Sequence, residues 1–169
     1  HQMWVAQYYR FNRPGALVSS GGLGCMGFGL PAAVGAQAGL PGETVILVTG
    51  DGSFQMTMQE MATAVEQELP VKVFILNNNC LGMVRQLQEV YYDKRYMATQ
   101  FKFLPDFEIF ARAYGIEAFT ARTGNEIDEV VKKALAIPGP VVVNCLVSAD
   151  ENVTPMVLAG KAINEAIDC

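Results

Sequence analysis

The sequence predicts an α/β fold, with an open, mostly parallel sheet and helices on both faces. Two short apolar runs rich in β-branched residues, 44–49 and 71–76, are typical of buried strands. A stretch with helical periodicity, residues 58–67, separates them. Such a strand–helix–strand unit makes its two strands parallel and brings their carboxyl ends to one edge of the sheet. Ligands of sheets of this type bind beyond that edge.

The elements around this unit continue the alternation of strands and helices. Residues 16–19 predict a short strand, and residues 28–38 predict a helix of small side chains that packs closely on a sheet. After the second strand of the unit, residues 81–91 predict a helix. Asp106 is placed to cap a further helix over residues 107–114.

The last third of the chain completes the sheet. Residues 117–120 predict a brief strand. Residues 126–136 predict an amphipathic helix, because apolar side chains recur every 3.6 residues and charged ones lie opposite. Residues 141–147 form an apolar run, which predicts a central strand, and residues 156–167 predict a closing helix.

Length and composition narrow the classes of protein and partner. A chain of 169 residues with 51% hydrophobic residues is expected to form one globular domain, residues 1–169. Its net charge of −5 argues against a nucleic-acid partner, and no apolar run reaches the roughly 20 residues of a membrane span.

Four scattered cysteines suggest a reducing cytoplasm, bacterial rather than organellar. The chain opens without Met, so we expect a C-terminal piece of a longer protein.

Polar residues follow both strands of the central unit. Gly50–Ser53, with the sequence Gly-Asp-Gly-Ser, ends the first strand, and Asn77–Asn79 ends the second. Because the strands are expected to be parallel neighbours, Asp51 and these asparagines are expected to emerge side by side. Hard oxygen ligands, flexible glycines and a hydroxyl suit a Mg²⁺ ion that carries a phosphate group.

This arrangement resembles the thiamine-diphosphate motif, which opens with Gly-Asp-Gly and closes with Asn-Asn. Here 24 residues, 53–76, lie between the two parts, which fits the spacing of that family. The alternative is two ordinary turns, since turns also favour Asp, Asn and Gly.

A second glycine motif supports a competing interpretation. Residues 22–27, Gly-Leu-Gly-Cys-Met-Gly, match G-x-G-x-x-G between a predicted strand and a predicted helix, and Asp51 ends the next predicted strand. That pattern is typical of NAD-binding dehydrogenase domains. It leaves the triple asparagine unexplained, and the glycines also have a purely structural explanation in close packing of helix on sheet.

Longer phrases resemble one family of thiamine-dependent enzymes, the acetohydroxyacid (acetolactate) synthase large catalytic subunits. The most specific are SGGLGCMGFGLPAA at residues 20–33 and YYDKRY at residues 91–96. Shorter matching phrases are His1–Trp4, Gly50–Met56, Gly82–Val84 and Pro105–Phe107. Another thiamine-dependent 2-oxo acid decarboxylase is the alternative within the same class, although such enzymes differ at these phrases.

The resemblance implies a reaction and a larger assembly. Pyruvate is decarboxylated and joined to pyruvate or 2-oxobutanoate, giving acetohydroxyacids for branched-chain amino-acid biosynthesis. These residues would be the third of three domains, with FAD in the middle domain and the catalytic glutamate in the first domain of a partner subunit. A homodimer or tetramer, a possible small regulatory subunit and an inactive isolated fragment are therefore expected.

The resemblance also assigns residues to the cofactors thiamine diphosphate and Mg²⁺. The metal ligands would be the side chains of Asp51 and Asn78 and the backbone carbonyl of Cys80. The residues expected to contact the diphosphate are His1, Gly52, Ser53, Leu81 and Gly82.

Further matched positions belong to the organic part of the cofactor and to the substrate. Gly24 and Met26 match the aminopyrimidine pocket, where Met26 would form an apolar wedge under the bent cofactor. Met83 matches an apolar wall near both cofactor and substrate. Leu87 stands where many family members carry a Trp that favours 2-oxobutanoate, so it puts that preference in doubt.

Several charged residues are expected to lie outside the chemistry. Arg85, Lys94 and Arg95 are interpreted as solvated or subunit-contact charges. Glu60 and Glu66 fall within a predicted helix away from the cofactor, so neither is expected to serve as a base.

Overall fold

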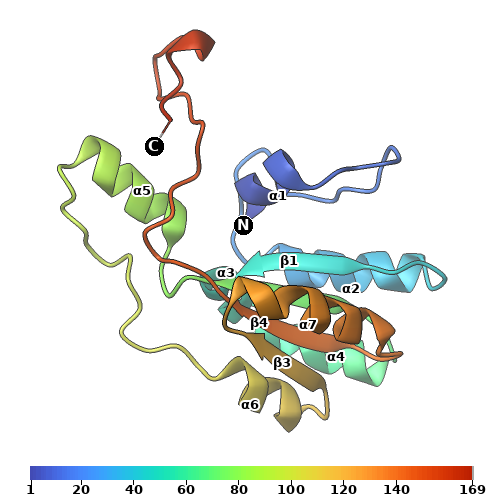
Figure 1. The fold of residues 1–169 in the computed structure, drawn as a ribbon. Coiled ribbons are helices and arrows are strands. Elements are labelled where there is room, and N and C mark those ends of the chain that lie inside the picture. The colour runs from blue at the N-terminus through green and yellow to red at the C-terminus, as the bar shows by residue number, and fades with distance from the viewer. Residues whose placement is uncertain (169) are drawn as a thin grey trace.

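The structure, a computed structural model, describes residues 1–168 and contains a four-stranded sheet whose strands are all parallel. The spatial order is β1-β2-β4-β3 (Figure 1). The strands are β1 (Ile46–Gly50), β2 (Lys72–Asn77), β3 (Glu117–Ala121) and β4 (Val141–Leu146). The register pairs Gly50 with Leu76 and Leu76 with Cys145, so β1, β2 and β4 end together at one edge. The predicted α/β class is confirmed.

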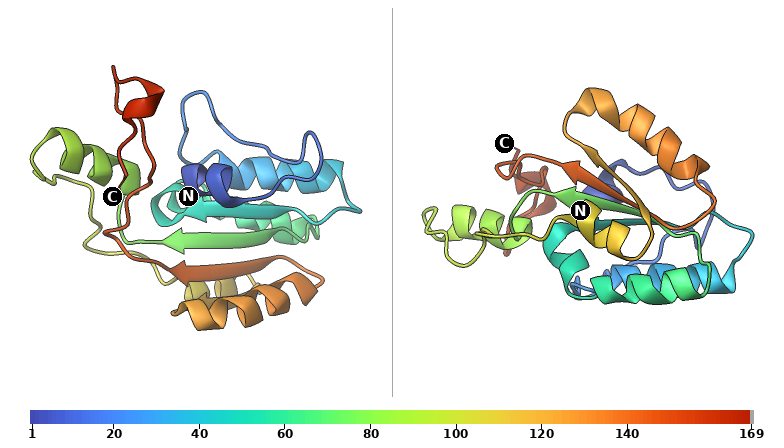
Figure 2. Two further views of the ribbon diagram at one scale, coloured as in Figure 1. Left: turned by 45° about the horizontal axis from the view of Figure 1, so that its top comes forward. Right: turned by 90° about the horizontal axis from the view of Figure 1, so that it is seen from below.

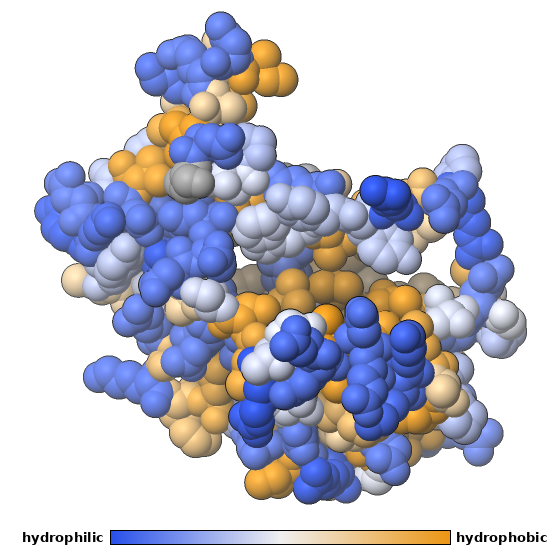
Figure 3. All heavy atoms as spheres, viewed as in Figure 1, coloured by the Kyte–Doolittle hydropathy of each residue, from blue (hydrophilic) through white to orange (hydrophobic). Residues whose placement is uncertain are grey.

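Helices cover both faces of the sheet, as expected. Two views in Figure 2 place α7 (Gly124–Ala136) on one face and the other sheet-packing helices on the opposite face. Those helices are α2 (Gly29–Gly39), α4 (Met61–Glu66) and α6 (Phe107–Ala113). The outward side of α7 is hydrophilic in Figure 3, in agreement with the amphipathic pattern of its sequence.

Alternation along the strands divides the core into two layers. Val73 and Ile75 of β2 pack with the helices α2, α4 and α6, whereas Phe74 between them packs beneath α7. The larger layer includes an edge-to-face pair, Phe54 and Phe107, with ring centroids 5.6 Å apart. Phe54 belongs to α3 (Asp51–Gln55), so the same core that holds α6 also fixes the turn that follows β1.

Some expected elements are absent or shorter. Residues 16–19 form no strand, because Leu17 and Val18 lie exposed and no described segment pairs with them. The helix expected over 58–67 is split into a 3-10 turn, η1 (Met58–Glu60), and α4. Two short helices that the sequence pattern did not predict are α1 (Gln2–Tyr8) and α3.

The closing helix expected over residues 156–167 is also wrong. Met156 and Ile167 instead exchange backbone hydrogen bonds as an antiparallel bridge, with a single 3-10 turn, η2 (Ile163–Glu165), between them. Gly160 has a φ of +80°, which ends any helical path through this segment. None of the helices found in residues 1–168 is both long enough and apolar enough to cross a membrane.

The predicted cap of α6 is present and can be tested. Asp106 accepts hydrogen bonds at Oδ1 from the backbone N–H groups of Glu108 and Ile109, at 2.9 and 3.0 Å. We expect Asp106→Ala to lower the free energy of unfolding by about 1 kcal/mol, because two backbone donors lose their acceptor. Asp106→Asn keeps a side-chain acceptor and is the matched control. Urea denaturation measures both, and equal losses in the two variants would contradict the capping role.

Candidate functional site

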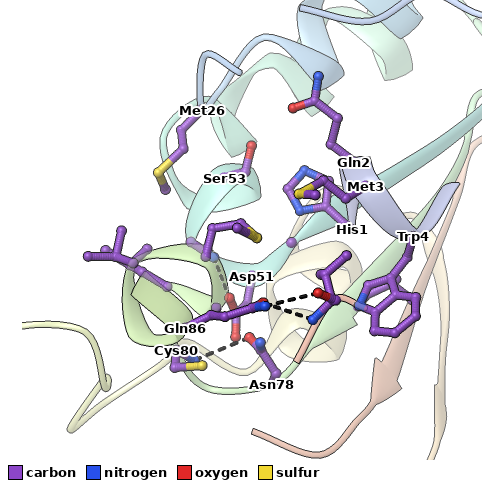
Figure 4. A pocket seen from close by; sticks show the side chains of 18 of the residues that line it. His1, Gln2, Met3, Trp4, Met26, Asp51, Ser53, Asn78, Cys80 and Gln86 are labelled. Atoms are coloured by element: carbon purple, nitrogen blue, oxygen red, sulfur yellow. Dashed lines mark hydrogen bonds between the residues drawn. The ribbon is translucent and has the colours of Figure 1, made fainter. Parts of the chain in front are cut away.

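A cavity of about 590 Å³ opens at the carboxyl edge of the sheet (Figure 4). Its walls come from α1, from the glycine-rich loop of residues 21–27, from the start of α3, from the segments after β2 and β4, and from α5 (Gly82–Tyr91). Parallel sheets of this type bind their ligands at this edge. The cavity therefore lies where the sequence motifs converge.

Asp51 lies at the floor of this cavity with only 1% of its surface exposed. Its Oδ1 accepts a hydrogen bond from the N–H of Gly52 at 2.6 Å, whereas its Oδ2 is buried without a partner among the described residues. Burial raises the pKa of Asp51, although the backbone N–H groups of Gly52, Asn79 and Asn78 act in the opposite direction. A buried carboxylate with one free oxygen suits a bound cation.

The turn after β2 brings Asn78 and Cys80 to the same cavity as Asp51. Asn78 accepts a hydrogen bond at Oδ1 from the N–H of Cys80 at 3.3 Å, and Figure 4 shows its amide next to the Asp51 carboxylate. The backbone carbonyl of Cys80 accepts no backbone hydrogen bond within residues 1–168. Asn79, with a φ of +56°, gives the turn the curvature that brings these groups together.

The donor set fits a hard divalent cation. No cluster of three or more His, Cys, Asp or Glu side chains that could hold a metal occurs in the described part of the chain. A cation at Asp51 would therefore use one carboxylate together with an amide oxygen and a backbone carbonyl, which suits Mg²⁺ better than zinc. The three residues expected as metal ligands, Asp51, Asn78 and Cys80, all line this cavity.

The residues expected to contact the diphosphate all line the cavity that contains Asp51, but the backbone N–H of one of them is already used. Gly52 approaches its neighbours so closely that a Cβ there would lie 2.9 Å from Leu81 Cδ2. His1 lines the cavity with its ring against Gly50, whose added Cβ would lie 2.9 Å from His1 Nδ1. The N–H of Leu81 already donates to the carbonyl of Thr99 at 2.7 Å, so in this structure it is not available to a ligand.

Ser53 and Gly82 also line the cavity, from the first turns of α3 and α5. Ser53 is buried, and its Oγ accepts a hydrogen bond from the N–H of Gly27 at 3.0 Å. This bond uses the oxygen and leaves the hydroxyl hydrogen of Ser53 free to donate.

The glycine-rich loop forms one wall but lacks the geometry of a dinucleotide fingerprint. Gly24 and Met26 both line the cavity. No strand precedes the loop within the described residues, and α2 begins only at Gly29, after Gly22–Gly27 has ended. The features that would place a dinucleotide pyrophosphate at a strand-to-helix turn are therefore missing.

Only one of the two residues expected to contact the substrate lines the cavity. Met83 lines the cavity from the first turn of α5. Leu87, one turn further along, is not among the lining residues and is 40% exposed. The role expected for Leu87 has no support from this cavity.

Arg85 is not solvated, which corrects the expectation from sequence. Its side chain is 3% exposed and donates to Glu89 Oε2 at 2.8 Å and to the backbone carbonyl of Asp150 at 3.2 Å. Lys94 and Arg95 are exposed as expected. Glu60 and Glu66 do not line the cavity, also as expected.

Sequence reasoning missed Gln86, Trp4 and Glu151, which all line the cavity. Gln86 Nε2 donates to the carbonyl of Val153 at 2.9 Å, and its Oε1 accepts from the N–H of Val153 at 2.8 Å. This two-point contact joins α5 to the segment that follows β4. No local pattern identifies it, because the partners are 67 residues apart in the chain.

Comparison with known proteins agrees with this geometry. Residues 1–145 match the family described as "Thiamine pyrophosphate enzyme, C-terminal TPP binding domain". The match covers both the motif at Asp51 and the asparagine turn.

Individual relatives are similar over nearly all of this chain. The acetolactate synthase large subunit of Porphyra purpurea is 46% identical over 163 residues, which is 96% of this chain and 28% of the relative. That of Cyanidium caldarium is 42% identical over 168 residues, or 99% and 28%. The mitochondrial acetolactate synthase of Schizosaccharomyces pombe is 46% identical over 167 residues, or 99% and 25%. The chain therefore spans about a quarter of the length of these relatives.

Gly82 offers a test of the metal geometry. A Cβ at Gly82 would lie 2.9 Å from Asn78 Nδ2, so we expect Gly82→Ala to push the Asn78 amide away from Asp51. Affinity for thiamine diphosphate in the presence of Mg²⁺ should fall about tenfold, or ~1.4 kcal/mol. Gly42→Ala is the control, since a Cβ there meets nothing within 4 Å. Calorimetric titration measures both, and an unchanged affinity in Gly82→Ala would contradict the placement of Asn78.

Proposed function

The chain belongs to the thiamine pyrophosphate enzymes, and from this premise we propose that its cavity holds the diphosphate of the cofactor through Mg²⁺. The observation that carries the proposal is the buried Oδ2 of Asp51, which has no partner within the described residues and lies beside the Asn78–Cys80 turn. A diphosphate brings negative charge to an acidic chain, with a net charge of −5. A divalent cation at Asp51 removes that repulsion.

The reaction we propose is that of an acetolactate synthase. Its support is the sequence identity of 42–46% to relatives that carry this name, together with a cavity whose remaining walls are largely apolar. The substrates would be pyruvate and a second 2-oxo acid, either pyruvate or 2-oxobutanoate. Bound thiamine diphosphate supplies the electron sink that decarboxylation of a 2-oxo acid requires.

The residues of this chain have binding and positioning roles in that reaction. Asp51, Asn78 and the Cys80 carbonyl hold the cation, and the free hydroxyl hydrogen of Ser53 donates to the diphosphate. Met26 and Met83 give apolar contact to the organic part of the cofactor and to the substrate, which excludes water from the reacting atoms.

The wider assembly is also proposed. In a full-length enzyme, FAD and the catalytic glutamate would lie in other domains, and a homodimer or tetramer, with or without a small regulatory subunit, would complete the site. Free thiols at Cys25, Cys80 and Cys145 are consistent with a reducing cytoplasm. Cys169, the fourth cysteine, lies outside the described residues.

Dependence on the metal is the first test of this function. We expect thiamine diphosphate to bind the chain only with Mg²⁺ and Asp51→Ala to abolish binding, because the cation then loses its one carboxylate ligand. Fluorescence of Trp4, the single tryptophan and a cavity residue, reports the titration. Asp128→Ala, which removes an exposed carboxylate on α7, should bind normally. Binding of NADH instead, or metal-independent binding, would overturn the proposal.

The second test concerns turnover. We expect the 169-residue chain to make no acetolactate, although it binds the cofactor. Of the residues that line the cavity only Asp51 and Glu151 carry carboxylates, and Asp51 would be engaged by the cation. An acetoin assay with pyruvate, Mg²⁺ and thiamine diphosphate measures this against a blank without protein. Turnover above the blank that Glu151→Gln removes would identify Glu151 as a base and contradict the expectation.

A further inference from the structure

In the glycine-rich loop that forms one wall of the cavity, only Gly27 is buried. Residues Gly21–Met26 are all exposed, with Leu23 at 92%, whereas the next residue, Gly27, is buried. Met26 nevertheless reaches the floor of the cavity, because its Cε lies 3.3 Å from the position of a Cβ on Gly52. An exposed loop thus holds an apolar side chain over the start of α3, and the place where it is fixed is Gly27.

Two side chains of the turn after β1 hold Gly27 from both sides. Its N–H donates to Ser53 Oγ at 3.0 Å, and its carbonyl accepts a hydrogen bond from Thr57 Oγ1 at 3.0 Å. The N–H belongs to the peptide plane before the Cα of Gly27 and the carbonyl to the plane after it. Because peptide groups are planar, the two bonds fix both backbone torsion angles of this one residue.

Gly27 needs such fixing more than other residues do. Its φ is +82°, which glycine adopts without strain. A glycine backbone can also adopt many other conformations, so this one is not fixed by the residue itself. A Cβ here would lie 3.2 Å from Met56 Cβ and 3.3 Å from Thr57 Cγ2, so any residue other than glycine would be both crowded and strained at this φ. The two hydrogen bonds restrict the backbone of Gly27, as a side chain would do at another residue. The Cα of Met26 belongs to the first of the two fixed peptide planes.

Thr57 does not itself line the cavity. We propose that Thr57 is a positioning residue that acts through Gly27 to hold Met26 over the cofactor cavity. This inference rests on the proposed function, in which the diphosphate lies at Asp51 and Ser53 and the organic part of the cofactor lies against Met26. Thr57 therefore matters to binding of the organic part and not to binding of the diphosphate.

The experiment compares two ligands on the same chain. Thiamine diphosphate and inorganic diphosphate, each with Mg²⁺, are titrated into the wild-type chain and into Thr57→Val, with calorimetry or Trp4 fluorescence as the readout. Thr57→Val keeps the shape of the side chain and removes the donor. We expect its affinity for thiamine diphosphate to fall about fivefold, the change that loss of one neutral hydrogen bond gives, and its affinity for inorganic diphosphate to stay within twofold.

Three variants serve as controls. Thr57→Ser restores the donor and should restore affinity for thiamine diphosphate. Thr63→Val makes the same chemical change at an exposed threonine of α4 and should change neither affinity. Met26→Ala removes the positioned side chain directly and should reproduce the selective loss, which keeps the proposal testable if Thr57→Val does not fold.

The outcomes separate this inference from the proposed function. Equal weakening of both ligands by Thr57→Val, or no change in either, overturns the positioning role, as does a Met26→Ala variant that loses no selectivity. If the wild-type chain binds neither ligand with Mg²⁺, the proposed function fails first. A selective loss in Thr57→Val that Thr57→Ser reverses supports the inference.

Discussion

The parallel register of β1 and β2 is the constraint on which the site depends. Gly50 pairs with Leu76, so the chain leaves both strands at the same height, with Asp51 following one and the asparagine turn following the other. A shift of this register by one residue would turn each strand over and exchange its buried and opposite faces. The register is protected by the two-sided core of β2, where Val73 and Ile75 pack on one face and Phe74 on the other. The packing that stabilises the fold therefore also sets the distance between Asp51 and the asparagine turn, the two segments proposed to hold the cation.

The helix that carries Met83 is positioned in a different way. In Figure 1, α5 extends away from the sheet, so packing on the strands does not hold it. Amide side chains hold it instead: Gln86 exchanges two hydrogen bonds with the backbone of Val153, and Gln88 exchanges two with that of Met97, at 3.0 and 3.1 Å. Pairs of this kind fix direction as well as distance, although each bond adds only about 1 kcal/mol. One wall of the cavity is thus fixed by the sheet. The wall formed by α5 is fixed by hydrogen bonds to two irregular segments, which contain Val153 and Met97.

The parts of the structure that sequence predicts are those set by local pattern. Four of the five predicted strands, the amphipathic helix α7 and the cap at Asp106 are present, and they follow from the hydrophobic period and from a single side-chain acceptor. The motif at Asp51 was recognisable because both of its halves lie at strand ends. The strand expected over residues 16–19 fails because an apolar run without a partner strand has nothing to bury it. The buried state of Arg85 could not be foreseen, since its partners at Asp150 and Asn152 are distant in sequence.

The unpartnered oxygen of Asp51 links stability to function. Because burial raises the pKa of Asp51, folding favours its protonated form, and the cation-free chain loses stability as pH rises from the ordinary aspartate pKa through the raised one. Above that window the ionised carboxylate is a cost to the fold. A cation that binds only the folded chain offsets this cost by mass action, and it binds the ionised carboxylate. Phe54, 1% exposed, packs in the apolar core, whereas Asp51, equally buried, keeps one oxygen without a partner in the described residues. That difference between two neighbouring buried residues is the physical reason to propose Asp51 for ligand binding rather than for a role in the core.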